Sequence, residues 1–357
     1  MERHPADRLA ALCRAILEAA GSSPNEADLV ATHLVDANLA GHDSHGVGMI
    51  PAYVGQLREG LYVANQEPAV VRDEGAVVVV DARRGLGQHM ARLALDLAIP
   101  RAKALGACVL SLRHSAHVGR IGAYGEYCGA NGLASTHFVN VIDHDPVVAP
   151  FGGSDGRFVT NPFCAGLPHG EGAFPLLDMA TSTIALGKAR VARNQGVPVP
   201  DGTLLDAEGR PTTDATALID HHEGALTAFG QHKGSGLAVM CELLAGALGG
   251  GGTVQPEHPR QQSIVNNMLS VLIDPAALGD PAAIAREAEA FQAYVKASPP
   301  APGTDRVLLP GEPEARQRAE RRRDGIPVDE MTMTQIVEAA DSVGIGSAEA
   351  AQLLSGA

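Results

Sequence analysis

Apolar residues recur at helical spacing along the N-terminal part of the chain. Five of them fall on one face of a first helix: Leu9, Leu12, Cys13, Ile16 and Leu17. We expect this helix to end at Gly21. The sequence Ser23-Pro24-Asn25-Glu26 is typical of a capping box with proline at the first helical position, so a second helix is predicted to run to about Ala40. A third helix is expected around residues 50–58, ending at Gly60.

From about Gly75 the pattern changes to β-branched runs that alternate with helical runs. The predicted strands are "AVVVVDA", "ACVLSLR", "GLASTHFVN", "FPLLDMA" and "SIVNNMLSVLID". The segment "GQHMARLALDLAIPRAKALG" is predicted to be mostly helix, broken at Pro100, and "GSGLAVMCELLAGALGG" is a strongly apolar helix. This alternation predicts an α/β fold for the middle of the chain.

Two domains are expected, because 357 residues exceed the roughly 100–200 residues of a typical domain. A proline-rich connector, "KASPPAPGTD", precedes a C-terminal amphipathic helix in "MTMTQIVEAADSVG". We place the boundaries near residues 73 and 307, so that residues 1–72 with 308–357 form a helical domain around an inserted α/β domain of residues 73–307. The basic run "ARQRAERRRDG" is interpreted as a solvated helix face.

Composition and charge narrow the class of partner. A net charge of −14 argues against binding to nucleic acid or to an anionic membrane, which both need a clustered basic face. A small-molecule substrate is therefore expected. The five cysteines form no C-x-x-C pair, which favours a reducing cytoplasm over a disulfide framework. Neither a signal peptide nor a run of roughly 18 apolar residues is found, so no membrane span is expected.

A Rossmann dinucleotide fingerprint is absent. Gly85-Leu86-Gly87 follows a predicted strand, but Met90 stands where the third glycine of that motif permits close helix packing. Residues alone therefore indicate an α/β protein with histidine-rich connections.

Those connections hold two H-x-x-H pairs, His42 with His45 and His114 with His117. One interpretation is a metal site of a hydrolase or lyase, since further ligands are available nearby in the sequence. The candidate additional ligands are Asp43, Asp143 and His144. The alternative for any single histidine is a hydrogen-bonded loop residue, and this applies most to His42, His114, His137 and His144.

His117 stands apart because Gly119-Arg120 follows it, so a titratable base lies next to a fixed cation. Such a cation holds a substrate carboxylate or lowers the pKa of the imidazole. This combination suits the oxidation of an alcohol next to a carboxylate. Ser44 and His45 offer a hydroxyl and a second imidazole as hydrogen-bond partners for the substrate, while Ser44 also suits a cap.

Around these residues the chain resembles the type 2 malate/L-lactate dehydrogenases, a family of NAD(P)-dependent 2-hydroxyacid dehydrogenases unrelated to the Rossmann enzymes. The blocks that carry the resemblance span nearly the whole chain: "GHDSHGVGMIPAYV", "DARRGLGQ", "HVGRIGAYGEYC", "HFVNV", "APFGGSDGRFVTNPFC", "LLDMATS", "GQHKGSGLAVMCELLAGAL", "NNML" and "PGEPE". The hydroxycarboxylate dehydrogenase B subgroup, which acts on 2-oxo acids including aromatic ones, is the most similar. The resemblance implies a helical domain built from both termini, a cofactor domain on a non-Rossmann, mixed and largely antiparallel sheet, and a homodimer.

The resemblance also implies roles for individual residues. His117 would be the catalytic acid/base, and Ser44 and His45 would contact the substrate. NAD or NADP would be lined by a further group of residues: Asn140, Asp178, Met179, Ala180, Lys233, Pro310, Gly311 and Glu312.

Two positions depart from the family pattern. Met49 stands where many members carry an arginine suited to clamping the substrate carboxylate, which makes Arg120 or backbone amides the candidates for that task. A methionine adds flexible apolar surface and favours a bulkier substrate tail. His114 stands where relatives often have asparagine, so the polar wall beside His117 is expected to differ.

Overall fold

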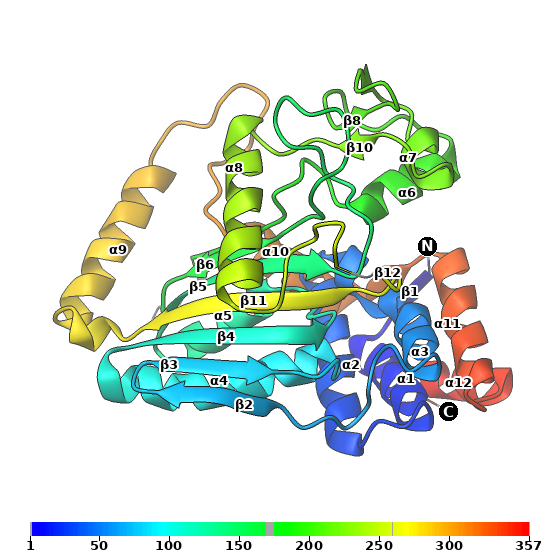
Figure 1. The fold of residues 1–357 in the computed structure, drawn as a ribbon, viewed down its shortest axis with the longest axis horizontal. Coiled ribbons are helices and arrows are strands. Elements are labelled where there is room, and N and C mark those ends of the chain that lie inside the picture. The colour runs from blue at the N-terminus through cyan, green and yellow to red at the C-terminus, as the bar shows by residue number, and fades with distance from the viewer. Residues whose placement is uncertain (1, 169–174, 259, 357) are drawn as a thin grey trace.

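A seven-stranded sheet forms the centre of the molecule (Figure 1). The computed structural model describes residues 2–168, 175–258 and 260–356. In sheet order the strands are β2 (Ala69–Glu74), β3 (Val77–Asp81), β4 (Ala107–Ala116), β11 (Val265–Ile273), β5 (Ala134–Ile142), β6 (Phe163–Gly166) and β7 (Leu176–Met179). β3 and β4 run parallel, and the other neighbouring pairs are antiparallel. The expected mixed, largely antiparallel sheet is confirmed.

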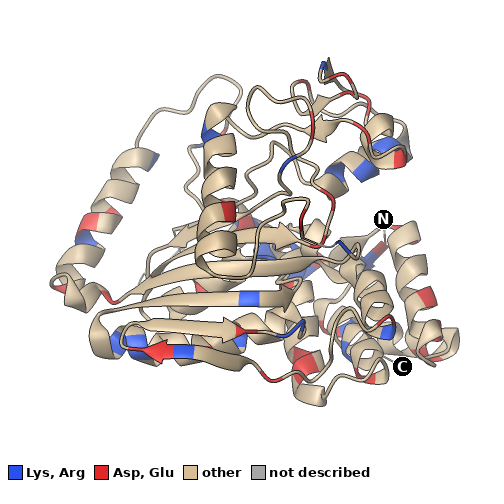
Figure 2. Ribbon diagram, viewed as in Figure 1, with Lys and Arg blue, Asp and Glu red and all other residues tan. Residues whose placement is uncertain are grey.

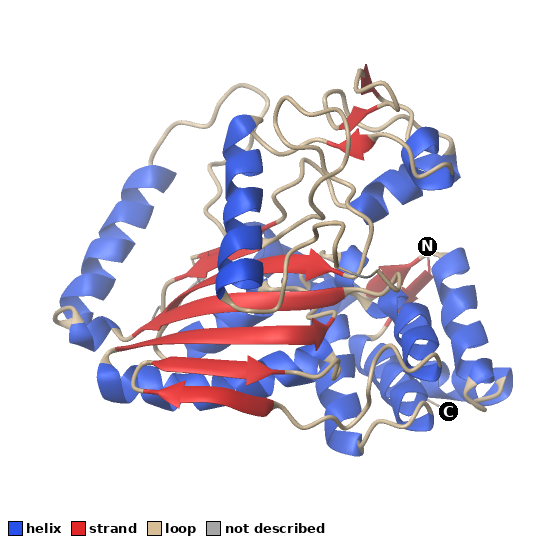
Figure 3. Ribbon diagram, in the orientation of Figure 1, coloured by secondary structure: helices blue, strands red, loops and turns tan. Residues whose placement is uncertain are grey.

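Helices cover both faces of this sheet (Figure 3). α4 (Gly87–Leu105) and α5 (Gly122–Ala130) pack on one face, and α8 (His232–Cys241) with the π-helix η3 (Glu242–Leu248) packs on the other. Side chains alternate accordingly along β4. Leu110 and Leu112 enter the core beneath α4, while the Ser111 hydroxyl between them donates to the Gly249 carbonyl at 3.1 Å on the opposite face.

The predicted break at Pro100 is wrong, because α4 continues through this residue to Leu105. Proline removes one backbone donor, but Pro100 is exposed and water can satisfy the carbonyl that loses its partner. Meanwhile Ala98, Ile99 and Ala102 are buried against the sheet. Tertiary packing of the apolar face therefore keeps the helix continuous.

A second core is shared by the two ends of the chain. It is built by α1 (Ala6–Ala19), α2 (Pro24–Leu39), α3 (Ile50–Arg58), α11 (Glu330–Ser342) and α12 (Ser347–Ser355), with the strand pair β1 (Glu2–His4) and β12 (Ile326–Val328). Figure 1 shows these elements gathered beside one end of the sheet. This shared core is consistent with the proposed helical domain, and the boundaries near residues 73 and 307 stay a prediction.

The expected capping box forms only in part. The Ser23 hydroxyl accepts the Glu26 N–H at 3.4 Å, but the Glu26 carboxylate does not reach back to Ser23. Asn65 intervenes: its side-chain oxygen accepts the Ser23 N–H at 2.6 Å, and its own N–H donates to Glu26 at 2.9 Å. The start of α2 is thus tied to the segment that leads into the sheet.

Most of the remaining elements lie on the α8 side of the sheet or extend from it. They are α6 (Leu186–Gln195), α7 (Thr216–Asp220), the short strands β8 (Leu204–Leu205), β9 (Pro211–Thr212) and β10 (Ala225–Leu226), and the helix α9 (Pro281–Lys296). The helix α10 (Glu312–Asp324) instead packs against α2 and contacts α5 on the other side of the sheet. Three short 3₁₀ turns complete the described elements: η1 (Asp43–His45), η2 (Val47–Met49) and η4 (Pro275–Ala277). Charged positions of both signs are interspersed through the fold (Figure 2).

Candidate active site

His117 and His45 meet at the end of β4, although they come from different parts of the chain. Their imidazole rings are stacked, with centroids 5.5 Å apart and planes 19° apart. The Ser44 hydroxyl lies 3.1 Å from Nδ1 of His45, and the Tyr53 hydroxyl lies 2.7 Å from Nδ1 of His117. The structure therefore joins the S-H-G and H-x-G-R blocks into one polar cluster.

Both imidazoles lie in surroundings that favour the neutral ring. Burial, followed by the charges of His45 and His33, holds the pKa of His117 well below its ordinary value. Burial, His42 and Arg120 lower the pKa of His45 to about 4. Neutral imidazoles at physiological pH are able to hydrogen-bond a hydroxyl or a carbonyl oxygen and to take up a proton.

Side chains of α2 and α10 hold the turn that carries Ser44 and His45. Asn38 donates to the Asp43 carboxylate at 2.6 Å and accepts the Val47 N–H at 2.8 Å. Arg321 donates to Asp43 at 2.5 and 3.0 Å and to the Asn38 carbonyl at 2.6 Å. These contacts fix the backbone on both sides of the Ser44-His45 pair.

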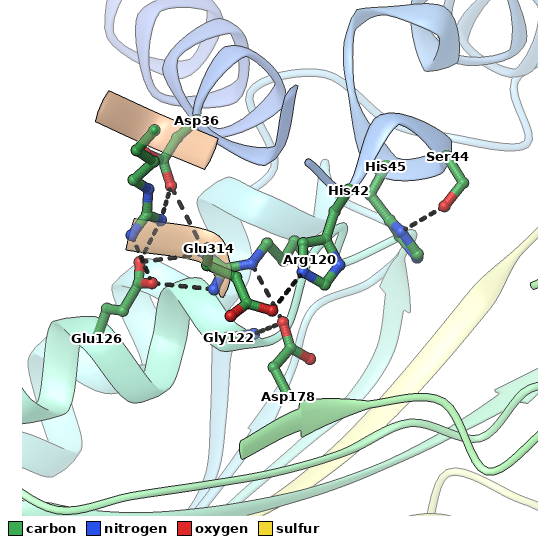
Figure 4. Close-up of polar contacts among 10 residues, drawn as sticks. Asp36, His42, Ser44, His45, Arg120, Gly122, Glu126, Asp178 and Glu314 are labelled. Atoms are coloured by element: carbon green, nitrogen blue, oxygen red, sulfur yellow. Dashed lines mark hydrogen bonds and ion pairs between the residues drawn. The ribbon is translucent and has the colours of Figure 1, made fainter. Parts of the chain in front are cut away.

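Arg120 does not lie where the sequence suggested. Its side chain is only 1% exposed and pairs with Glu126 at 2.9 Å, Asp178 at 3.1 Å and Asp36 at 3.7 Å (Figure 4). A guanidinium that is buried among three carboxylates has no free edge for a substrate carboxylate. The interpretation of Arg120 as a carboxylate clamp is therefore replaced by that of a buried ion-pair centre.

The basic run of α10 belongs partly to the same network, so its interpretation as a solvated face holds only for the exposed Arg316, Arg322 and Arg323. Arg318 donates to Glu126 and Asp36 at 2.7–2.8 Å, and Arg321 is buried against Asp43 as described above. His42 adds a contact to Glu314 of α10 at 3.3 Å. Arg318 and Arg321 are three residues apart and therefore lie on one face of α10. The alternation of arginines with glutamates made this shared face hard to recognise from the sequence.

The residues considered for a metal site have other partners. Asp43 binds Arg321, Asp143 pairs with Arg84 at 3.0 Å, and the ring of His144 contacts the Asp145 carbonyl at 2.7 Å. Among residues 2–168, 175–258 and 260–356, no group of three His, Cys, Asp or Glu side chains is arranged to hold a metal ion.

Most of the expected cofactor residues gather around the end of β7. The Leu176 N–H donates to the Pro310 carbonyl at 3.3 Å, which brings Gly311 and Glu312 beside β7. The Phe229 N–H donates to the Thr181 carbonyl at 3.0 Å, which brings the start of α8, with the exposed Lys233, toward Met179 and Ala180.

The side chain of Asp178 turns away from this group. It is buried, accepts the Gly122 N–H at 3.0 Å and pairs with Arg120. Burial raises the pKa of Asp178 above its ordinary value, and Arg120 opposes that effect. Asp178 thus anchors the end of β7 to α5, and its backbone is the part left to face a cofactor.

Asn140 is fully buried, and its amide is occupied. It donates to Glu242 at 3.0 Å and to the Gly252 carbonyl at 3.1 Å, and it accepts from Asn267 at 3.0 Å. Asn161 donates to the same Glu242 carboxylate at 2.9 Å. In this structure the Asn140 side chain links β5 to η3, and its assignment to the cofactor stays a prediction.

Met49 and His114 differ in their relation to the site. Met49 is partly buried and packs against the core that the two ends of the chain share. The ring of His114 contacts Asp81 of β3 at 3.0 Å, and its backbone adopts a φ of 51°, in the left-handed region that asparagine and histidine tolerate better than most residues. The structure thus shows no contact of His114 with His117.

Sequence reasoning missed four contributors to the site: Tyr53, Asn38, Arg321 and Gln88, whose amide donates to the Tyr53 hydroxyl at 2.7 Å. The signals were weak, since each lies in an otherwise ordinary helical stretch. For Asn38 and Gln88 the one available signal is a polar residue on an otherwise apolar, buried helix face.

The sequence model of the malate/L-lactate dehydrogenase family matches residues 4–337. The chain belongs to this family. Hydroxycarboxylate dehydrogenase B of Escherichia coli (strain K12) is 44% identical over 345 residues, which cover 96% of this chain and 95% of that protein. The L-lactate dehydrogenase of Cupriavidus necator is 46% identical over 311 residues, which cover 87% and 89%.

Solved structures of the malate/L-lactate dehydrogenase family share the fold. A malate/lactate dehydrogenase-type structure from E. coli superposes with a TM-score of 0.95 at 42% identity, covering 100% of this chain and 99% of that one. Sulfolactate dehydrogenase from Methanocaldococcus jannaschii gives a TM-score of 0.84 at 31% identity, covering 97% and 98%.

Membership settles the class of reaction. The chain is an NAD(P)-dependent 2-hydroxyacid dehydrogenase, which interconverts a 2-hydroxy acid and a 2-oxo acid by hydride transfer. The comparisons give no support to a metal-dependent hydrolase or lyase. None of the helices in the described part of the chain has the length and apolar character that a bilayer crossing needs.

Proposed function

We propose that His117 is the acid/base of this dehydrogenase and that Ser44 and His45 position the reacting oxygen of the substrate. The observation that carries the proposal is the convergence of these three residues, with His117 stacked on His45 and fixed by Tyr53. When bound, the nicotinamide ring accepts or supplies the hydride at C2 of the substrate. As charge develops on the substrate oxygen, His117 takes or returns the hydroxyl proton.

The chain's own residues fit a nicotinamide dinucleotide. Lys233 is exposed at the start of α8, where its ammonium group suits the phosphate oxygens of a dinucleotide. Gly311, with a φ of 90°, turns the backbone beside β7. We propose that Met179, Ala180, Lys233 and the 310–312 turn line the cofactor, NAD or NADP, and that Asp178 contributes through its backbone.

A link between the cofactor segment and the substrate residues supports this arrangement. A Cβ built on Gly187 of α6 would lie 3.4 Å from Cβ of Ser44, so the segment that follows Ala180 packs directly on the Ser44 turn. Hydride transfer requires the two reactants in contact, and this packing brings their proposed sites together.

For the substrate we propose a 2-oxo acid with an apolar tail. Met49 replaces a cation by flexible apolar surface, and Arg120 is committed to its carboxylates. A second negative group on the substrate, as in oxaloacetate, would then lack a partner. Among the relatives, the names hydroxycarboxylate, L-lactate and sulfolactate dehydrogenase show that the family accepts different tails.

We further propose a homodimer in a reducing compartment such as the cytoplasm. Every residue of α9 keeps some exposure, and Phe291 and Tyr294 are 64% and 78% exposed, an apolar face that a second copy would cover. Figure 1 shows α9 standing clear of the sheet. All five cysteines are free and buried, which suits a compartment where thiols stay reduced.

The test is the loss of reduced-nicotinamide absorbance with NADH and with NADPH against pyruvate, oxaloacetate, 2-oxoglutarate and phenylpyruvate, with a chelator present throughout. We expect oxidation that depends on the 2-oxo acid, is fastest with phenylpyruvate and is unaffected by the chelator. Activity that survives in His117→Ala would overturn the assignment of His117.

A further inference from the structure

A buried hydrogen-bond chain runs behind His117. Nε2 of Gln88 lies 2.7 Å from the Tyr53 hydroxyl oxygen, and that oxygen lies 2.7 Å from Nδ1 of His117. Gln88 is fully buried and Tyr53 is 1% exposed, so water does not compete for these groups. The three side chains come from α4, α3 and the end of β4.

The backbone is shaped to allow this chain. A Cβ built on Gly87 would lie 2.2 Å from the carbonyl oxygens of Ala116 and His117, so only glycine lets α4 begin against the His117 backbone. That close approach places the next residue, Gln88, within reach of Tyr53. Gly87, which does not belong to a Rossmann fingerprint, therefore has a structural role at the start of α4.

The direction of the chain determines which nitrogen of His117 carries the proton. In the structure the Gln88 amide N–H donates to Tyr53, so the single hydroxyl hydrogen of Tyr53 is left to donate to Nδ1 of His117. A neutral imidazole that accepts at Nδ1 carries its proton at Nε2. This form donates to the carbonyl oxygen of a 2-oxo acid but has no lone pair at Nε2 to accept a hydroxyl proton.

We propose that Tyr53 and Gln88 are positioning residues that set the tautomer of His117, and that the chain reverses by rotation of the Gln88 amide when His117 acts as acid or base. This deepens the proposed function and rests on His117 being the acid/base. In the reversed chain Nδ1–H of His117 donates to the Tyr53 oxygen, and the Tyr53 hydroxyl donates to Oε1 of Gln88.

An orphaned atom supports the reversal. Oε1 of Gln88 is buried and has no hydrogen-bond partner in the observed arrangement, and rotation of the amide would turn it toward the Tyr53 hydroxyl. The switch between tautomers moves one proton from Nε2 to Nδ1: solvent takes up the Nε2 proton and returns one at Nδ1 while the substrate site is empty, and Tyr53 keeps its own hydrogen. With Nδ1 protonated, the proton count balances in both directions. In oxidation Nε2 accepts the hydroxyl proton while Nδ1 stays protonated, and in reduction Nε2 returns that proton to the alkoxide oxygen formed by hydride addition.

Tyr53 itself does not exchange its proton, because burial raises its pKa well above the ordinary value for a phenol. The other titratable groups that face His117 are His45 from η1, His33 from α2 and Tyr62 from the loop after α3. Burial and neighbouring cations lower the pKa of His33 to about 3 and that of His45 to about 4, so neither titrates near neutral pH.

The first measurement is the ¹⁵N NMR spectrum of histidine-labelled enzyme, with His117 assigned by the signal lost in His117→Asn. We expect the free enzyme at pH 8 to show the Nε2–H tautomer, and Tyr53→Phe to give a mixture of tautomers. An Nδ1–H tautomer in the wild type, or an unchanged signal in Tyr53→Phe, overturns the proposal. Because no turnover is needed, this result is independent of the role of His117.

The second measurement is the pH profile of kcat for reduction. A hydrogen bond to the imidazolium is stronger than one to the neutral ring, so Tyr53→Phe should lower kcat about 10- to 100-fold and move the midpoint to lower pH by about one unit. In Gln88→Glu the ionised carboxylate can only accept a hydrogen bond from Tyr53. The Tyr53 oxygen then accepts from Nδ1–H of His117, which favours the imidazolium and moves the pH midpoint of kcat upward. A packing defect would not produce opposite shifts.

The matched control is Tyr62→Phe. Tyr62 is a buried tyrosine whose ring packs edge-on against Tyr53 and whose hydroxyl donates to the Ile264 carbonyl at 2.9 Å, so the ring of His117 loses no partner. We expect a loss of stability with the same pH midpoint. If Tyr53→Phe moves the pH midpoint of kcat no more than Tyr62→Phe does, the proposed roles of Tyr53 and Gln88 are wrong, even where His117→Asn is inactive. If His117→Asn stays active, the proposed function fails instead.

Discussion

The imidazole rings of His45 and His117 lie nearly parallel, with centroids 5.5 Å and planes 19° apart. Two positive charges at this separation repel each other, so protonation of one ring disfavours protonation of the other. Ser44 holds His45 at Nδ1, and Tyr53 holds His117 at Nδ1, so the two rings have distinct anchors. This pairing places His117, the proposed acid/base, next to a ring that lowers the pKa of His117.

Removal of His45 should therefore change the pH dependence of the enzyme. Burial comes first among the causes that lower the pKa of His117, and His45 comes next. In His45→Asn we expect the pKa of His117 to rise toward its ordinary value, so that the protonated form needed for reduction persists to higher pH. The midpoint of the kcat profile moves upward, and the KM for the 2-oxo acid increases because a hydrogen-bond partner is lost. An unchanged midpoint would contradict the coupling.

Replacement of Arg120 should reduce stability more than it reduces substrate affinity. Arg120→Met leaves Asp178 without its buried cation and Glu126 with Arg318 alone, which costs about 3–5 kcal/mol in the free energy of unfolding. Arg157→Met is the control, because Arg157 and Asp155 form an exposed pair worth roughly 0–1 kcal/mol. Urea unfolding measures both. A large increase in the KM for the 2-oxo acid in the folded Arg120→Met enzyme would restore the clamp interpretation.

Met49→Arg should change the substrate preference. The new guanidinium would lie at the edge of the Ser44 turn and would offer a bidentate partner for a second carboxylate. We expect kcat/KM for oxaloacetate to rise relative to that for phenylpyruvate by about tenfold or more, the effect of one charged hydrogen bond. The ratio of the two kcat/KM values is the measurement, and an unchanged ratio would show that residue 49 does not face the tail.

Acid should destabilise the fold through a histidine far from the site. His137 is fully buried between Ser270 at 2.8 Å and Ser135 at 3.0 Å, and burial lowers its pKa to about 4. The unfolded chain binds this proton near pH 6.5, so stability falls as the pH decreases from about 6.5 to about 4, by up to about 1.4 kcal/mol per pH unit. His137→Gln should show a shallower loss of the free energy of unfolding over this range. An equal slope in both proteins would exclude His137 as the cause.

Much of the fold was predictable because its signals are local. Apolar periodicity located α1 and α11, the capping sequence at Ser23 located the start of α2, and β-branched runs located β3, β4, β5 and β11. The predicted helix break at Pro100 was wrong because proline indicates only a local backbone preference. The packing of Ala98 and Ile99 decides whether the helix continues. Local pattern thus predicts elements better than it predicts where they bend.

Only the site residues that belong to short sequence motifs were predictable. Ser44, His45 and His117 were recognised from their blocks, and the structure brings them together. Arg120 was misinterpreted because sequence proximity to His117 gives no direction for the side chain, and Glu126 and Asp178 capture it. The contacts of Asn140 could not be predicted for the same reason, since its partners Glu242 and Asn267 are distant in sequence.

The central claim is that His117 exchanges the substrate proton, and the most direct measurement is kcat for reduction of the best 2-oxo acid by wild type and His117→Asn. We predict that kcat falls by a factor on the order of 10²–10⁴. Binding of reduced cofactor, followed by its fluorescence, should stay within about threefold of the wild type, because His117 acts on the substrate oxygen. A His117→Asn enzyme that retains most of its kcat, with its cofactor bound normally, would contradict the account.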